Sequence, residues 1–170
     1  MNTADEERSA LMDDDLGHLM ATVAWALGSR ELVALGEFGL DLRSYGVLCL
    51  AVEAERTQNA ISGLLRIDRT TIAAIVDDLE AAELVVRHPA PDDRRARLVV
   101  PTPAGRALAD RARARVRATE DACLADLRPD GRRELMAALT VLARGRLAAP
   151  VDTTGASVVP RRRPRRGQPG

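Results

Sequence analysis

The side chains best suited to chemistry are an Arg and two Thr residues at the start of a helical stretch. Arg69, Thr70 and Thr71 follow Asp68 directly, and Ala74 comes one turn later. An Arg fork can bind guanine edges, a Thr hydroxyl can serve a base or a phosphate, and an Ala methyl can meet the thymine methyl. These residue types favour contact with the edges of DNA bases. The alternative is an ordinary solvated helix face.

A helix-turn-helix pattern would position these residues. The Asp68 carboxylate can cap the helix, because it can accept the unpaired N–H groups of the first turn. The apolar residues of the helix recur at three- and four-residue spacing, at Ile72, Ile75, Val76 and Leu79. Thr57 can cap a shorter helix over residues 58–65, and residues 66–68 make a turn of the length that the motif uses. The second helix of such a unit enters the major groove. Lesser candidates, for contacts to the DNA backbone, are Thr57, Gln58 and Ser62.

Two short runs of β-branched residues follow and enclose a basic segment. Residues 84–87 and 98–100 favour strands, and Pro101 is expected to stop the second one. Residues 88–93 hold two prolines and an Asp pair, which favour a turn without regular structure. The basic residues that lead into the second strand are Arg94, Arg95 and Arg97. Helix, strand, basic tip and returning strand together describe a winged helix.

These segments resemble the MarR family of winged helix-turn-helix regulators. The matching stretches are the helix from Thr57 to Leu65, "DRTTIAAIVDDLEAAELVVR", the wing "PDDRRARLVV", and "TPAG" at the start of the next helix. The resemblance covers about residues 12–147. One departure is Glu83, where the family often has a Gly that ends the helix in a left-handed conformation.

The resemblance implies roles for the wing residues. Arg95 corresponds to the Arg that enters the minor groove, and Asp93 to the acid that orients it by an ion pair. We expect Arg94 and Arg97 to contact phosphates. A solvated charged hairpin is the alternative for all four residues.

The flanking segments are expected to be long helices that join two copies of the chain. The fold class is therefore mainly α with a small β-wing, in which a winged helix-turn-helix over residues 41–101 is flanked by dimerisation helices over 12–35 and 102–147. Asp41 caps a buried helix over 42–53, and Thr102 precedes Pro103 in a helix to about residue 127. A turn over 128–131 and a last helix over 132–147 follow. The resemblance implies a homodimer, and a two-fold dimer should read a pseudo-palindromic operator in double-stranded DNA.

Small-molecule regulation is a further implication of the resemblance, because the family holds effectors between the dimer helices and the winged helix-turn-helix. The residues on the corresponding elements are His18, Trp25, Arg43 and Tyr45. An aromatic or lipophilic effector is expected, and packing in the core or on the surface is the alternative for each residue. Cys49 and Cys123 are interpreted as small core hydrophobes.

Composition excludes several other classes of function. The chain has 170 residues, a formal net charge of zero and 25 basic residues, all of them Arg. No cysteine spacing suggests a metal site or a disulfide framework, and no cofactor is expected. With two His, no G-x-S-x-G and no phosphate loop, the chain is not expected to be an enzyme. Residues 1–11 are expected to be a flexible acidic start and residues 148–170 a disordered Arg-rich tail. No apolar run is long enough to span a membrane, so a cytoplasmic protein is expected.

The sequence thus predicts a homodimeric, sequence-specific DNA-binding transcriptional regulator, a repressor that a small-molecule effector releases. The alternative is a helical protein-interaction module that has lost specific DNA reading. Asp77, Asp78 and Glu83 favour the alternative, because they make the second helix less basic. Arg69 and the Arg residues of the wing argue against it.

Overall fold

A computed structural model describes residues 14–91 and 96–149, which form two compact units divided after Asp126. The first unit contains helices α2 (Leu16–Gly36), α3 (Leu42–Glu53), α4 (Gln58–Leu65), α5 (Arg69–Ala81) and α6 (Pro103–Cys123), and strands β1 (Arg56–Thr57), β2 (Val85–Pro89) and β3 (Arg97–Pro101). The second unit contains α7 (Pro129–Arg144) and the 3-10 helix η2 (Arg146–Ala148). The expected acidic start, the wing-tip residues Asp93, Arg94 and Arg95, and the Arg-rich tail beyond residue 149 lie outside the described residues.

Polar caps fix where the helices of the first unit begin. Four predicted cap residues each accept a hydrogen bond, at 2.7–3.2 Å, from the backbone N–H three residues ahead. They are Asp41, Thr57, Asp68 and Thr102. At Asp41 the cap is reciprocal, because the Ser44 hydroxyl accepts from the Asp41 N–H. Asp15 caps α2 in the same way, so this helix starts at Leu16, four residues later than expected.

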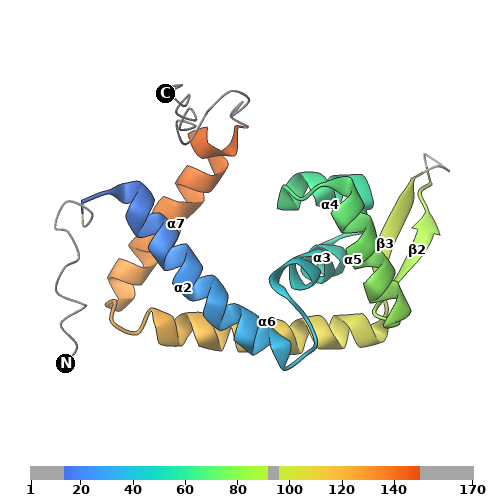
Figure 1. Ribbon diagram of the computed structural model, residues 1–170, viewed down its shortest axis with the longest axis horizontal. Coiled ribbons are helices and arrows are strands. Elements are labelled where there is room, and N and C mark those ends of the chain that lie inside the picture. The colour runs from blue at the N-terminus through green and yellow to red at the C-terminus, as the bar shows by residue number, and fades with distance from the viewer. Residues whose placement is uncertain (1–13, 92–95, 150–170) are drawn as a thin grey trace, which may run out of the picture. The chain divides into compact units, whose positions relative to one another are not determined.

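An aliphatic core connects the helix-turn-helix to the long helices. The largest fully buried side chains come from α2 to α5 and from two strands: Leu35, Val47, Leu48, Ile61, Ile72, Val76, Val85 and Val99. Helix α3 contacts α2, α4, α5, α6 and β3, so it is the central element of this unit, as its apolar sequence predicted (Figure 1). One face of α5 is buried in this core, and the opposite face of the helix stays available for other contacts.

The wing belongs to a three-stranded antiparallel sheet in the order β1-β3-β2. β1 was not predicted, because two residues are too few to show a periodic pattern. Prolines end both wing strands, and the register pairs Pro89 with Arg97 and Val85 with Pro101. The expectation that prolines exclude His88 and Pro89 from a strand was wrong. β2 is an edge strand, so one side of it needs no N–H donor.

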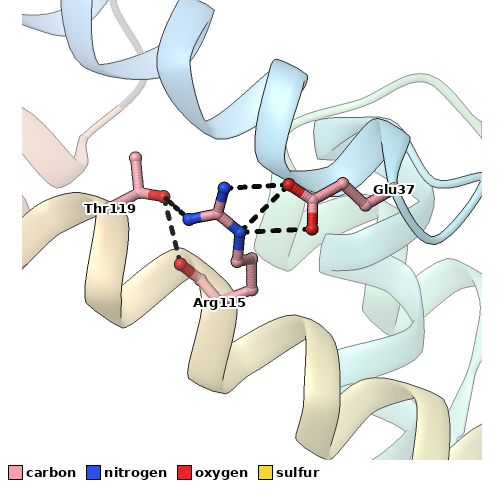
Figure 2. Close-up of polar contacts among 3 residues, drawn as sticks. All are labelled: Glu37, Arg115 and Thr119. Atoms are coloured by element: carbon pink, nitrogen blue, oxygen red, sulfur yellow. Dashed lines mark hydrogen bonds and ion pairs between the residues drawn. The ribbon is translucent and has the colours of Figure 1, made fainter.

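The two long helices of the first unit are joined by an ion pair (Figure 2). The Arg115 guanidinium of α6 donates to Glu37, the C-cap residue of α2, with an Nη2–Oε1 distance of 2.8 Å and an Nε–Oε1 distance of 3.1 Å. The third guanidinium nitrogen, Nη1, donates to the Thr119 hydroxyl at 3.4 Å. The hydrogen bonds from Arg115 lower the pKa of Glu37 below its ordinary value. The contact therefore holds the end of α2 against the middle of α6.

The end of α6 and the start of α7 both lie earlier in the chain than the sequence predicted. α6 ends at Cys123, four residues earlier than expected, and α7 begins at Pro129 rather than at Arg132. The segment expected to be a turn is the first turn of α7, because Pro is favoured at the first helical position and Asp130 is favourable near a helix N-terminus. No helix in the part of the chain that the structure describes is both long and apolar enough to cross a membrane.

Two long helices, α2 and α7, leave large apolar side chains uncovered within one chain. Trp25 and Val33 of α2 are 76% and 75% exposed, and Val141 of α7 is 70% exposed. Other exposed apolar residues of these helices are Leu16, Leu19, Met20, Val23, Leu32, Met136, Leu139 and Leu142. Uncovered apolar surface of this kind marks sites of association.

Candidate nucleic-acid interface

The turn between α4 and α5 is fixed by its own hydrogen bonds. Arg66 ends α4 in a left-handed conformation with φ 55°, and the Ile67 N–H donates to the Ser62 carbonyl at 3.2 Å. The Ser62 hydroxyl donates to the Ile67 carbonyl at 2.6 Å. Ser62 and Thr57 are both half-buried, and both side chains hold the local fold. Gln58 is half-buried as well, and contact of these three residues with DNA stays a prediction.

The first turn of α5 presents part of the predicted reading set to solvent. Arg69, Thr70 and Ala74 are exposed, whereas Thr71 is half-buried. The Asp68 carboxylate accepts from the Thr71 N–H at 2.9 Å and from its hydroxyl at 2.6 Å. These bonds lower the pKa of Asp68, since they stabilise the charged carboxylate. The Thr71 side chain therefore supports the cap that Asp68 makes, and the predicted reading residues that are open to solvent are the other three.

Two acids in the second half of α5 pair with another residue of the chain. Asp77 and Glu80 of α5 both pair with Arg87 of β2, and the Arg87 Nη1–Glu80 Oε2 distance is 3.1 Å. The Arg87 backbone N–H also donates to Glu80 Oε1 at 3.2 Å. Sequence reasoning missed Arg87, although two acids one turn apart on a helix, followed by an Arg in the next strand, offered a signal.

The corner after α5 has a left-handed residue although that residue is not a Gly. Glu83 adopts the left-handed conformation with φ 57° that a Gly would accept without strain. The Leu84 N–H donates to the Leu79 carbonyl and the Glu83 N–H to the Glu80 carbonyl, both at 2.9 Å. This pair of bonds is a Schellman motif, which satisfies the last carbonyls of the helix.

The start of α6 is attached to that corner. The Thr102 hydroxyl donates to the Glu83 carbonyl at 2.8 Å, and the Thr102 N–H donates to the Leu84 carbonyl at 3.0 Å. Thr102 also caps α6 through the Gly105 N–H. The segment TPAG thus connects the end of α5, the start of β2 and the start of α6 at one point.

The described part of the wing places one predicted residue. Arg97 is exposed at the start of β3, opposite Pro89, and the Ala90 N–H donates to the Ala96 carbonyl at 3.0 Å. That bond closes the hairpin just below the tip. Arg97 therefore lies at the end of the described hairpin that is nearest the wing tip, and its contact with phosphate stays a prediction.

The predicted effector residues lie on two helices, and their contact with an effector stays a prediction. His18 is half-buried and Trp25 exposed on α2, whereas Arg43 is exposed and Tyr45 half-buried on α3. Burial, together with hydrogen bonding to Cys49, raises the pKa of Tyr45 to about 12. The pKa of Arg113 of α6 is raised, chiefly by Cys49 and also by Tyr45, so the three side chains lie near one another between α3 and α6.

Two grooves among the described residues are lined by other side chains than those four. A groove of about 540 Å³ lies between the α2–α3 connection and α5, lined by Phe38, Gly39, Leu40, Asp41, Ser44, Ile75, Asp78, Leu79, Ala82 and Leu84. A second, of about 920 Å³, lies between α2 and α6, and its lining includes Val23, Leu27, Val33, Arg115 and Cys123. Among the described residues, no three His, Cys, Asp or Glu side chains gather in a way that could hold a metal ion. Both cysteines are free and half-buried.

Comparison with known proteins agrees with this geometry. The model of the MarR family matches residues 38–96. A MarR-family transcriptional regulator from Rhodococcus sp. RHA1 is 33% identical, with 80% of this chain and 97% of that chain covered and a TM-score of 0.75. The chain belongs to the MarR family. This assignment confirms the predicted fold class, and it makes the chain a member of a family of transcriptional regulators rather than of enzymes.

Two structures of another MarR-family relative carry ligands. CouR from Rhodococcus jostii RHA1, solved with p-coumaroyl-CoA, is 31% identical, with 81% of this chain and 98% of that chain covered and a TM-score of 0.72. The repressor CouR bound to a 23-mer DNA duplex is 29% identical, with 79% and 96% covered and a TM-score of 0.74. No curated protein matches the chain by sequence.

Proposed function

We propose that this MarR-family chain is a homodimeric, sequence-specific DNA-binding repressor that acts in the cytoplasm and is released by a small-molecule effector. One observation carries the DNA-binding part. The start of α5 exposes Arg69, Thr70 and Ala74, while the inner face of the same helix, at Ile72 and Val76, is fully buried. A recognition helix needs this combination, because its N-terminal side chains reach base edges while the fold holds its axis.

Two-fold association is supported by the apolar surface of the long helices. Val23 and Val33 are exposed within one chain and line the groove between α2 and α6. Covering that surface with a second copy would remove it from water at about 25 cal/mol per Å² of apolar area. A symmetric dimer would read a pseudo-palindrome whose half-sites lie about one helical turn apart.

Repression and its release rest on the relatives. CouR is named a repressor in complex with DNA and was also solved with an aromatic thioester of coenzyme A. We infer an aromatic or lipophilic effector for this chain as well, with His18, Trp25, Arg43 and Tyr45 as its predicted contacts. An effector that prefers an arrangement of the two winged helices that does not fit the operator must weaken operator binding, and operator binding must weaken effector binding by the same factor.

The alternative, a protein-interaction module without DNA reading, has one feature in its favour, the acidic second half of α5. The structure reduces its weight, because Arg87 pairs with both Asp77 and Glu80. The exposed acid that remains on that half of the helix is Asp78, and it faces the groove beside Leu40.

The test is fluorescence anisotropy of the full chain with the duplex upstream of its own gene and with a scrambled duplex, at two salt concentrations. We expect tight binding to the first duplex alone. Arg69→Ala should weaken it by about 1–3 kcal/mol, the usual worth of an Arg–guanine contact. Arg117→Ala is the matched control, because Arg117 is an exposed Arg on α6. Equal, weak and steeply salt-dependent binding to both duplexes would contradict specific reading.

A further inference from the structure

Arg87 is enclosed between the wing strand and the recognition helix. Its side chain is 23% exposed, although the two carboxylates that it binds are 64% and 39% exposed. Within the described residues, Arg87 Nε is buried and has no hydrogen-bond partner. The stem of the side chain is thus covered, and both terminal nitrogens point toward α5. α5 and β2 lie side by side in Figure 1.

The two acids lie on the stripe of α5 that continues from the reading end. Thr70, Ala73, Asp77 and Glu80 follow one another at three- and four-residue spacing, which places them on one face. A helix that enters the major groove with Thr70 brings the rest of this stripe toward DNA phosphates. Free carboxylates there would repel the phosphates and lower affinity.

The geometry provides a counter-charge for both acids at once. Nη1 of Arg87 binds Glu80 while Nη2 binds Asp77, and the backbone N–H of Arg87 holds the other Glu80 oxygen. One guanidinium cannot neutralise two carboxylates, but it removes half of their combined charge and satisfies oxygens on both. Because the main chain and side chain of one residue bind the same carboxylate, the fork is held against the helix and away from the outer surface.

We propose that Arg87 is a positioning residue for DNA binding, which acts as an internal counter-charge to Asp77 and Glu80 and makes no contact with the DNA. The inference rests on the proposed DNA binding and adds a residue to it. In this arrangement the acidic half of α5 can lie beside phosphates, while direct reading is left to Arg69, Thr70 and Ala74.

The experiment is a series of full-length variants tested on a duplex that the wild-type chain selects from a random-sequence pool. Arg87→Met should weaken binding about tenfold, since it leaves two uncompensated carboxylates beside the DNA. Arg87→Lys cannot bridge both carboxylates, but it keeps a positive charge beside them and should stay within about threefold of the wild type. The triple variant Arg87→Met/Asp77→Asn/Glu80→Gln removes all three charges and should also return to within about threefold.

The salt dependence separates a counter-charge from a phosphate contact. Loss of a direct phosphate contact lowers the slope of log K against log[salt] by about 0.9, whereas loss of an internal counter-charge leaves the number of bound phosphates unchanged. We therefore expect Arg87→Met to keep the wild-type slope. A slope reduced by about one unit, a triple variant as weak as Arg87→Met, or wild-type affinity in Arg87→Met would each overturn the proposal.

One further variant covers the case in which Arg87→Met does not fold, as judged by its melting temperature. Asp77→Asn/Glu80→Gln, with Arg87 in place, should bind at least as tightly as the wild type, because the repulsion is gone. Tenfold weaker binding of that double variant would contradict the counter-charge role. If the wild-type chain itself selects no duplex, DNA binding fails first, and that outcome is distinct from failure of this series.

Discussion

Gly105 of α6 packs directly on the main chain of Leu84, so that a Cβ on Gly105 would lie 2.0 Å from the Leu84 carbonyl oxygen. Leu84 is the residue at which the recognition helix gives way to the wing. The long helix can approach this corner closely because Gly105 lacks a side chain, and Thr102 then completes the contact with its hydrogen bonds.

Gly105→Ala should destabilise the chain strongly. The neighbour is a main-chain oxygen, which cannot rotate away as a flexible side chain would, so α6 or the corner must shift. Overpacking of this kind costs about 1–3 kcal/mol, and we expect the upper end of that range in urea unfolding. Gly63→Ala in α4 is the matched control, because nothing lies within 4 Å of its Cβ position. Equal stability of the two variants would show that the corner is not tightly packed.

Glu83→Gly should stabilise the chain by about 0.5–1 kcal/mol, because a residue with a Cβ is strained at the left-handed φ of 57° whereas Gly is not. Glu83→Ala is the control and should bring no such gain, since it keeps the Cβ. Thermal unfolding of the three proteins at equal concentration measures the difference. A gain shared by the Ala variant would assign the effect to the lost carboxylate instead.

The Arg115–Glu37 contact should make stability depend on acidity. The folded-state pKa of Glu37 is lowered from 4.5, chiefly by hydrogen bonds from Arg115, so its contribution is complete above pH 4.5 and is lost as pH falls through the lowered value. Glu37→Gln should therefore lose less stability than the wild type on acidification through that window. Arg115→Gln should flatten the profile in the same way. If the pH profiles of the wild type and Glu37→Gln are parallel, the contact has no energetic role.

Adjacent threonines should separate stability from reading. Thr71→Val loses the hydroxyl bond to Asp68, so we expect about 1 kcal/mol lower stability in thermal unfolding. Thr70 is exposed, and Thr70→Val should leave the melting temperature nearly unchanged while lowering affinity for the selected duplex about tenfold. The assignment fails if Thr70→Val binds DNA as the wild type does.

A charge on the apolar face of α2 should weaken the proposed dimer. Val33 is 75% exposed in one chain, and Val33→Glu would place an unpaired carboxylate in the proposed interface. The cost of about 2 kcal/mol or more corresponds to at least a tenfold higher dimer dissociation constant in sedimentation equilibrium. Leu64→Glu, at an exposed apolar residue of α4, is the control and should leave the dimer intact. An unchanged mass for Val33→Glu would place the interface elsewhere.

Local chemistry was predictable from the sequence, and contacts between distant residues were not. The caps at Asp41, Thr57, Asp68 and Thr102 were all predicted, because a cap depends on residues three positions apart. Strand β1 was missed because its two residues pair with β3, about forty positions later in the chain. The start of α7 was missed because the proline at its first position was interpreted as part of a turn.

The candidate site divides in the same way. The exposure of the start of α5 followed from the spacing of its apolar residues, since the face opposite a buried stripe is outward. That pattern could not show that Thr71 and Ser62 hold turns and caps, or that Arg87 covers the second half of the stripe. Each of these depends on where a side chain points, which periodicity does not determine.

The attachment of α6 at Thr102 and Gly105 makes the long helix a lever for the reading head. With 21 residues at 1.5 Å each, α6 is about 30 Å long. A tilt of about 5° at its far end displaces its first turn by about 3 Å, close to the rise of one base pair. Thr102 and Gly105 contact the main chain of Glu83 and Leu84 directly, so the corner after α5 should move together with the start of α6. In the proposed regulator, an effector that tilts α6 by a few degrees would therefore shift the start of α5 relative to its half-site.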